Sequence, residues 1–274
     1  ADYQVVREAA EEALEICRAA QLDWHMVPAL DCLSAAHRGL GNYQRALHLS
    51  QEAAQVAEEI GVPRFLSFVF HLQAMHYQDL RLLERAEAFF RRALHASEEA
   101  GSAFFLPLIQ AGLAVARLRQ GDLVVGPFLQ KALASAMERG QKQQAAGCIE
   151  GLAELAAAKG DIEKVIEFTD RLARLAERGN MRERMSPAHG WRGFALHAMG
   201  HSDAAANELG RAAVLAQIIG SPRLLWDVHD AFVHHYGVIG DPQMVTHHEG
   251  EIKKIVTGIA DGLDDEALKT GLPY

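Results

Sequence analysis

Histidine is the residue whose number and spacing first suggest chemistry in this chain, which has 14 histidines among 274 residues. The closest pairs in sequence are His71 and His76, His197 and His201, His234 and His235, and His247 and His248. A metal site needs converging ligands with cysteine or carboxylate support, and adjacent residues on a helix point in different directions. No HExxH motif is present. The sequence therefore predicts no metal and no cofactor, and it predicts histidines on the surface or in a groove, some of which titrate near neutral pH.

The cysteines do not suggest nucleophilic catalysis either. Cys17, Cys32 and Cys148 occupy apolar positions of helical patterns, which predicts small core residues. There is no GxSxG nucleophile elbow. Three widely spaced cysteines without a CxxC motif are typical of a reduced, cytoplasmic compartment. We expect a protein that is not an enzyme.

Two sets of glycines separate the elements that position these side chains, and consecutive members of each set, counting Arg81 in the first, are 39 to 41 residues apart. The first set is Gly41, Gly121, Gly160, Gly200 and Gly240, with Arg81 in the place of a sixth. The second set is Gly61, Gly101, Gly140, Gly179 and Gly220. Such a period predicts a stacked array of repeats. At Arg81 we expect a turn that is strained or differently shaped.

Composition limits the classes of function. The chain is 49% hydrophobic with a formal net charge of -9 and a pI of about 5.9, so it lacks the basic face that nucleic-acid binding needs. The longest uncharged stretch, 102–116, is too short to span a bilayer. The first residues already form an amphipathic helical pattern without a signal peptide or an initiator methionine. We therefore expect a piece of a larger protein, with no membrane contact.

Between the glycines the apolar spacing is helical throughout. A leading helix is expected at 4–20, followed by alternating A and B helices and a short final helix at 264–270. The expected A helices are 24–40, 64–80, 104–119, 142–158, 183–198 and 223–238. The expected B helices are 43–60, 83–100, 123–139, 162–178, 202–219 and 242–259. The whole chain, 1–274, is predicted to be one array, with units at about 22–61, 62–101, 102–140, 141–179, 180–220 and 221–262.

The turns between A and B helices have a chemical rationale. Glycine can take the left-handed conformation that ends a helix. The aspartate that follows in three turns, Asp122, Asp161 or Asp241, can then accept the free N–H groups of the next helix. Asn42 and Ser202 are expected to cap in the same way. A long coiled coil is excluded because heptads never run far enough, whereas a four-helix bundle repeated twice stays an alternative.

The unit sequences resemble the tetratricopeptide repeat. The phrases LGNYQRALHLSQEAAQVAEEIGVP at 40–63 and KGDIEKVIEFTDRLARLAERGN at 159–180 carry the resemblance. The family's turn glycine matches the first glycine set. Its small residue, where the two helices touch, matches Ala46, Ala86, Gly126 and Ala205, while Val165 and Val245 are larger than usual. The resemblance implies an all-α, right-handed superhelical solenoid of antiparallel helix pairs.

These units are longer than the ~34 residues of ordinary tetratricopeptide repeats. This long form resembles the sensor domain of MalT-type, LuxR-type and signal-transducing ATPase regulators of bacteria. The resemblance implies a non-enzymatic protein- or ligand-binding module, the sensor or interaction domain of a larger transcriptional or signalling regulator. A free-standing scaffold, adaptor or peptide receptor stays open as an alternative, as does self-association through the end units.

The family places its A helices on the inner, concave side, so the resemblance implies which residues face a groove. The residues expected to face the groove are Arg38, Phe68, His71, Met75, Gln78, Asp79, Arg119, Glu150, Glu154, Phe194, His197, Asp227, Asp230 and His234. Asp31, Val115 and Leu118 fall at inner positions as well. We expect this groove to take a peptide, a protein segment or a small-molecule effector, although a merely solvated inner wall is the alternative. Its later part is acidic, which suits a basic partner.

Overall fold

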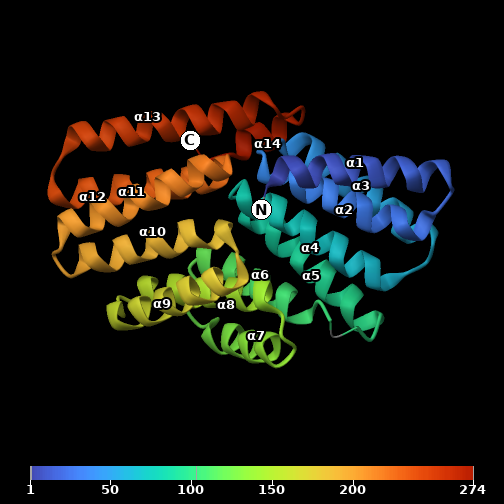
Figure 1. Cartoon of the computed structure of the whole chain (residues 1–274), viewed down its shortest axis with the longest axis horizontal. Helices are drawn as coiled ribbons and strands as arrows, with labels where there is room; N and C mark the ends of the chain where they lie inside the picture. The colour runs from blue at the N-terminus through green and yellow to red at the C-terminus, as the bar shows by residue number, and fades with distance from the viewer. Residues whose placement is uncertain (1, 103, 274) are drawn as a thin grey trace. The chain divides into compact units, whose positions relative to one another are not determined.

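The computed structural model describes residues 2–102 and 104–273, and every regular element in this part of the chain is a helix. The described residues form fourteen helices, and within each compact unit neighbouring helices pack side by side as antiparallel pairs joined by short turns (Figure 1). The predicted all-α fold of helix pairs is confirmed. No helix among the described residues combines the length and the apolar character needed to cross a bilayer.

The helices belong to two compact units. The N-terminal unit comprises Asp2–Asp122 together with Ile259–Pro273, and the C-terminal unit comprises Leu123–Gly258. The N-terminal unit contains α1 (Tyr3–Ala19), α2 (Asp23–Gly39), α3 (Tyr43–Glu59), α4 (Pro63–Asp79), α5 (Leu83–Glu99), α6 (Leu106–Arg119) and α14 (Glu266–Gly271). The C-terminal unit contains α7 (Gly126–Glu138), α8 (Lys142–Ala158), α9 (Ile162–Gly179), α10 (Arg182–Ala198), α11 (Ser202–Ile219), α12 (Pro222–Ile239) and most of α13 (Pro242–Asp261).

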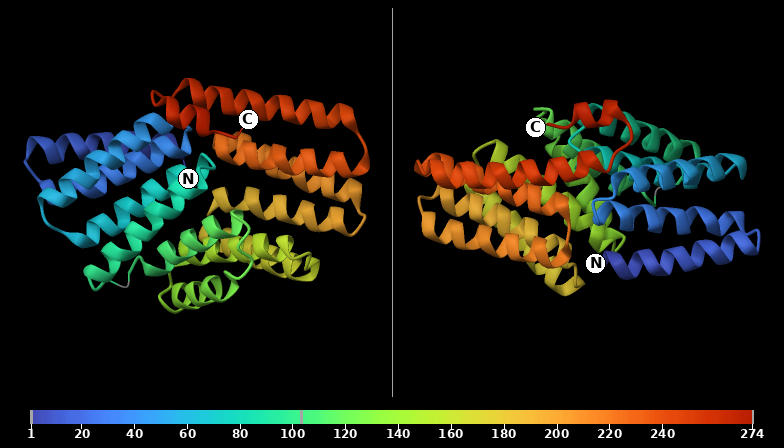
Figure 2. Two further views of the ribbon diagram at one scale, coloured as in Figure 1. Left: turned by 180° about the vertical axis from the view of Figure 1, so that it is seen from behind. Right: turned by 90° about the horizontal axis from the view of Figure 1, so that it is seen from above.

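The even-numbered helices from α2 to α12 are the A helices, and the odd-numbered helices from α3 to α13 are the B helices. Each A helix packs against the B helices before and after it within its unit, as the further views in Figure 2 show. Ala46, Ala86 and Ala205 are fully buried, at the position where the resemblance implies a small residue. Interiors are close-packed, so a larger side chain at these points would push the helices apart.

The last residues of the chain pack in the N-terminal unit. Leu263, Leu268 and Leu272 are buried there. The backbone N–H of Asp264 donates to Oε1 of Gln44, the second residue of α3, at 2.9 Å. The short helix expected at 264–270 is thus present as α14, and it lies beside helices far from it in sequence (Figure 1).

The turn glycines take left-handed backbone conformations, with one exception. Nine of the ten glycines in the two sets have positive φ. Gly179 instead lies inside α9, and Asn180 takes the left-handed position with φ 49°. Arg81 has φ 59°, so its turn has the same geometry as the glycine turns. We expected a turn that is strained or differently shaped at Arg81, and the first alternative holds, because a non-glycine residue is strained in this conformation.

The predicted helix caps are confirmed at two of five sites. The Asp161 side chain accepts from the backbone N–H of Lys164 at 3.2 Å, and Asp241 accepts from Met244 at 3.1 Å. Asn42 makes no side-chain cap bond at the start of α3. Ser202 is already the first residue of α11. The capping predictions for these two residues were therefore wrong.

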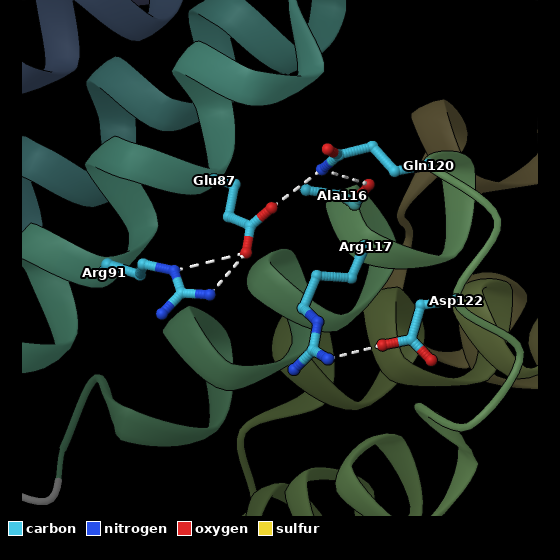
Figure 3. Close-up of polar contacts among 6 residues, drawn as sticks. All are labelled: Glu87, Arg91, Ala116, Arg117, Gln120 and Asp122. Carbon is cyan, nitrogen blue, oxygen red and sulfur yellow. Dashed lines mark hydrogen bonds and ion pairs between the residues drawn. The ribbon is translucent and has the colours of Figure 1, made fainter.

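Asp122 binds an arginine instead of capping the next helix. Its Oδ2 lies 2.5 Å from Nη2 of Arg117, one turn back on α6 (Figure 3). Beside this pair, Gln120 donates to Glu87 on α5 at 2.9 Å, so the end of α6 is tied to α5. The expected helix at 123–139 begins only at Gly126. The capping prediction for Asp122 was wrong, because α7 starts four residues later, with Val125 at its N-cap position.

Candidate functional site

Side chains predicted to face the groove come together on α2 and α4 in the N-terminal unit. Nε of Arg38 lies 3.4 Å from Oδ2 of Asp79, whose side chain is 7% exposed. The two residues occupy the last turns of neighbouring A helices, one repeat apart. We call Asp31, Arg38, His71, Gln78 and Asp79 the α2–α4 patch.

Three members of the α2–α4 patch are buried with polar atoms that make no hydrogen bond to the described protein atoms. These atoms are Oδ1 of Asp31, Nδ1 of His71 and Oε1 of Gln78. The residues are 3%, 5% and 8% exposed, respectively. Leaving a buried donor or acceptor unmatched costs about 1–3 kcal/mol. With Oε1 of Gln73, Nδ1 of His76 and Nδ1 of His37, the described residues include four such atoms on α4 and two on α2, which is an unusual concentration.

Burial changes the protonation of this patch. It raises the pKa of Asp31 well above its usual range, because the charged carboxylate loses water. Burial, with a smaller contribution from the nearby Arg38 guanidinium, lowers the pKa of His71 to about 3. Near neutral pH the His71 imidazole is therefore uncharged, so its unmatched Nδ1 can serve a ligand as a donor or as an acceptor, according to the tautomer.

Sequence reasoning missed a polar contact behind the patch. The Ser34 hydroxyl donates to the backbone oxygen of Ala46 at 2.7 Å and lies 2.9 Å from Nε2 of His76. A hydroxyl has one proton, so Nε2 of His76 must donate to Ser34, which assigns the tautomer. This contact ties α2 to α3 and α4. The only sequence signal for this contact is that Ser34 and His76 are polar residues at buried helical positions. That signal does not show that the two side chains, 42 residues apart, contact each other.

Predicted groove residues also meet in the C-terminal unit. The rings of Phe194 on α10 and His234 on α12 stack with centroids 6.0 Å apart. His197 packs edge-on against His234 at 5.8 Å, and its Nδ1 lies 2.9 Å from Nδ1 of His235. We call Phe194, His197 and His234 the α10–α12 patch. Unlike the buried members of the α2–α4 patch, all three are at least partly exposed.

The acidic residues near this patch are partly neutralised. Glu150 pairs with Arg184 at 2.7 Å, and Asp227 pairs with Arg223 at 2.8 Å. Glu154, Asp227 and Asp230 are all of intermediate exposure. The predicted acidic character of the later A helices therefore comes with arginine partners: Arg223 lies four residues from Asp227 on α12, whereas Arg184 reaches Glu150 from 34 residues away.

The other predicted groove residues are more scattered. Phe68 packs against Phe105 at the start of α6, with ring centroids 4.8 Å apart. Met75 is half-buried and Arg119 is exposed at the end of α6. Val115 and Leu118 are buried. These positions do not add polar groups to the α2–α4 patch.

The cysteines fit a structural role in two of three cases. Cys17 and Cys148 are buried as predicted, and burial raises the pKa of Cys148 to about 12. Cys32 is exposed, so the prediction of a core position was wrong for it. Burial of its thiol and the neighbouring Asp31 charge raise the pKa of Cys32 too. Raised thiol pKa values disfavour the thiolate that a nucleophile needs. The described residues contain no group of three or more histidine, cysteine or acidic side chains that could hold a metal ion.

Comparison with known proteins relates the fold to helical repeat proteins. No family model and no curated protein sequence matches the chain. Among solved structures, a Rap protein complexed with Competence and Sporulation Factor is similar at TM-score 0.71 and 14% identity, covering 95% of this chain and 76% of that one. BtubC (BKLC) from P. vanneervenii is similar at TM-score 0.57 and 19% identity, covering 80% and 91%. A tetratricopeptide repeat protein from Parabacteroides merdae is similar at TM-score 0.51 and 13% identity, covering 99% and 97%. At these identities the likeness shows a tetratricopeptide-like helical repeat fold and nothing finer.

Proposed function

We propose that this chain is a non-enzymatic binding module that takes an extended peptide segment on its A helices. The observation that carries the proposal is the set of buried, unmatched polar atoms of Asp31, His71 and Gln78. A peptide offers alternating donors and acceptors along its backbone, and both kinds of group occur in the α2–α4 patch. A donor of the peptide would bind Asp31 and Gln78, and binding would then recover the free energy that the unmatched atoms lose.

The α10–α12 patch supports the same proposal with different chemistry. Phe194 and His234 form a half-buried aromatic surface that suits an apolar or aromatic side chain of the peptide. The Rap protein of similar fold was solved with Competence and Sporulation Factor bound, so a protein of this architecture binds such a factor. We infer that peptide binding has a regulatory role, in which the peptide-bound module favours one arrangement of its helices. Such regulation requires the peptide to bind two helix arrangements with different affinities.

The experiment selects peptides from a displayed random library on the full chain and measures their affinities by fluorescence anisotropy. We expect Gln78→Leu to weaken binding by about tenfold, which is one good polar contact in free energy. Replacing an unmatched buried amide with an apolar group of similar size leaves folding neutral or improved. A loss of affinity with an unchanged urea midpoint therefore reports binding and not misfolding.

The matched control is Gln51→Leu, the same change at an exposed position on B helix α3. It should leave affinity unchanged. Selected peptides that bind Gln78→Leu and Asp31→Asn as tightly as the unmodified chain would refute the α2–α4 patch as the binding site, and failure to select any peptide would refute the proposed function.

A further inference from the structure

A second surface lies on the B-helix side of the C-terminal unit. A hollow of about 790 Å³ opens between α7 and α9, with α8 as its floor. Leu133 and Met137 of α7, Leu152 and Leu155 of α8, and Phe168 of α9 make its lining mostly apolar. Met137 is 50% exposed, so apolar surface reaches the rim of the hollow.

The hollow has the length of a short helix. Its α7 wall extends from Gly126 to Met137, which is about 18 Å at about 1.5 Å per residue, or three turns. The late start at Gly126 leaves α7 with 13 residues, whereas α3 and α5 have 17. Two helices that flank an apolar floor form the kind of groove into which an amphipathic helix packs.

The charges lie on one side of the hollow only. The α7 wall is uncharged, whereas the α8–α9 side carries Lys159, Lys164 and Arg171 together with Asp161 and Glu167. Asp161 is already engaged, because it caps α9 and pairs with Lys164 at 2.5 Å. The two remaining cations, Lys159 and Arg171, outnumber the one remaining anion, Glu167. This wall therefore has a net positive charge, in a chain whose net charge is -9.

We propose that the hollow docks an amphipathic α-helix of a partner protein, with its apolar face on α8 and acidic side chains along the flank that meets α9. Apolar burial would supply most of the affinity, and the acidic flank would set the orientation. The adaptable thioether of Met137 suits the rim of such a groove. This surface is separate from the α2–α4 and α10–α12 patches, so the inference does not rest on the proposed peptide binding.

The test uses two synthetic helices of about 14 residues, or roughly four turns, both with leucine along one face. One carries glutamate on its flanks and the other carries lysine. Fluorescence anisotropy with the full chain should show the acidic helix binding about tenfold tighter at low salt, with the preference shrinking as salt rises. Met137→Glu should weaken the acidic helix by about tenfold, because it places a charge on the apolar contact. Arg171→Glu should narrow or reverse the preference between the two helices.

The control variant is Ile218→Glu, the same kind of change at a 70% exposed position on B helix α11. It should bind both helices as the unmodified chain does. Equal affinity for the two helices, or unchanged binding by both Met137→Glu and Arg171→Glu, would overturn the proposal. So would absence of helix binding combined with self-association that Met137→Glu abolishes, because the occupant would then be a second copy of this chain.

Discussion

Individual residues in this protein hold conformations and burials that are unfavourable by themselves. Gln21 and Arg81 have φ of 54° and 59°, a region that side chains with a Cβ disfavour. Asp31 and Gln78 bury oxygens without a protein partner. The left-handed residues are explained by the turn that the repeat requires. The turn of the repeat does not explain the unmatched oxygens of Asp31 and Gln78. We therefore propose that these oxygens bind a ligand.

The strain at Gln21 can be measured. Gln21→Gly should raise the free energy of unfolding by about 1 kcal/mol, because glycine adopts positive φ without a steric penalty. Gly61→Ala, at φ 67° with open space around the missing Cβ, should lower it by a similar amount. Urea unfolding of both variants provides the comparison. A neutral or destabilising Gln21→Gly would show that the glutamine side chain contributes a compensating contact.

Among the elements, a side-chain cap accompanies some helix starts and is absent from others. Asp161 and Asp241 cap α9 and α13, which begin at the next residue, and α3 begins directly after Asn42 without such a bond. Asp122 binds Arg117, and α7 begins late. The shortened α7 in turn borders the hollow beside α9. The Arg117–Asp122 ion pair at the end of α6 therefore precedes the late start of α7, and α7 borders the hollow.

Capping predicts a difference between two residues in equivalent turns. Asp241→Ala should lower the free energy of unfolding by about 1 kcal/mol, because the backbone N–H of Met244 loses its acceptor. Asn42→Ala should change it by less than about 0.5 kcal/mol, as for a surface substitution without such a contact. Thermal and urea unfolding of the two variants test this. Equal losses would mean that Asn42 caps α3 in solution.

Across the whole molecule, buried histidines make the fold sensitive to acid. His71 and His76 on α4, and His235 and His248 in the C-terminal unit, all have a lowered pKa because burial disfavours the charged ring. Two pairs of rings share a hydrogen bond between Nδ1 atoms at 2.9 Å, His197 with His235 and His229 with His248. Such a bond is lost when both rings carry a proton there.

The folded chain should therefore lose stability as the pH falls below about 6.5, the ordinary histidine value. A histidine with a depressed folded pKa binds its proton less readily in the folded state, so its stabilisation is present above 6.5 and is lost on acidification. For His71 this continues toward its folded pKa of about 3. Each such group contributes a slope of up to about 1.4 kcal/mol per pH unit.

Urea unfolding at pH 7.5, 6 and 5 measures the slope, and His71→Leu should reduce it. His201→Leu, at an exposed histidine just before α11, is the matched control and should reduce the slope less than His71→Leu does. An unaltered slope in His71→Leu would contradict the assignment of a neutral, buried imidazole.

The sequence by itself determined the helices and most of their turns, because helical periodicity, left-handed glycines and caps such as Asp161 act within a few residues. Only the tertiary structure decided what the inner side chains do. Arg38 pairs with Asp79 and Ser34 with His76 across one repeat, and Asp264 reaches Gln44 over 220 residues. Such contacts depend on the distances between packed helices, which no local pattern encodes. The burial that leaves Oδ1 of Asp31 and Oε1 of Gln78 without protein partners, and the hollow beside α7, arise for the same reason.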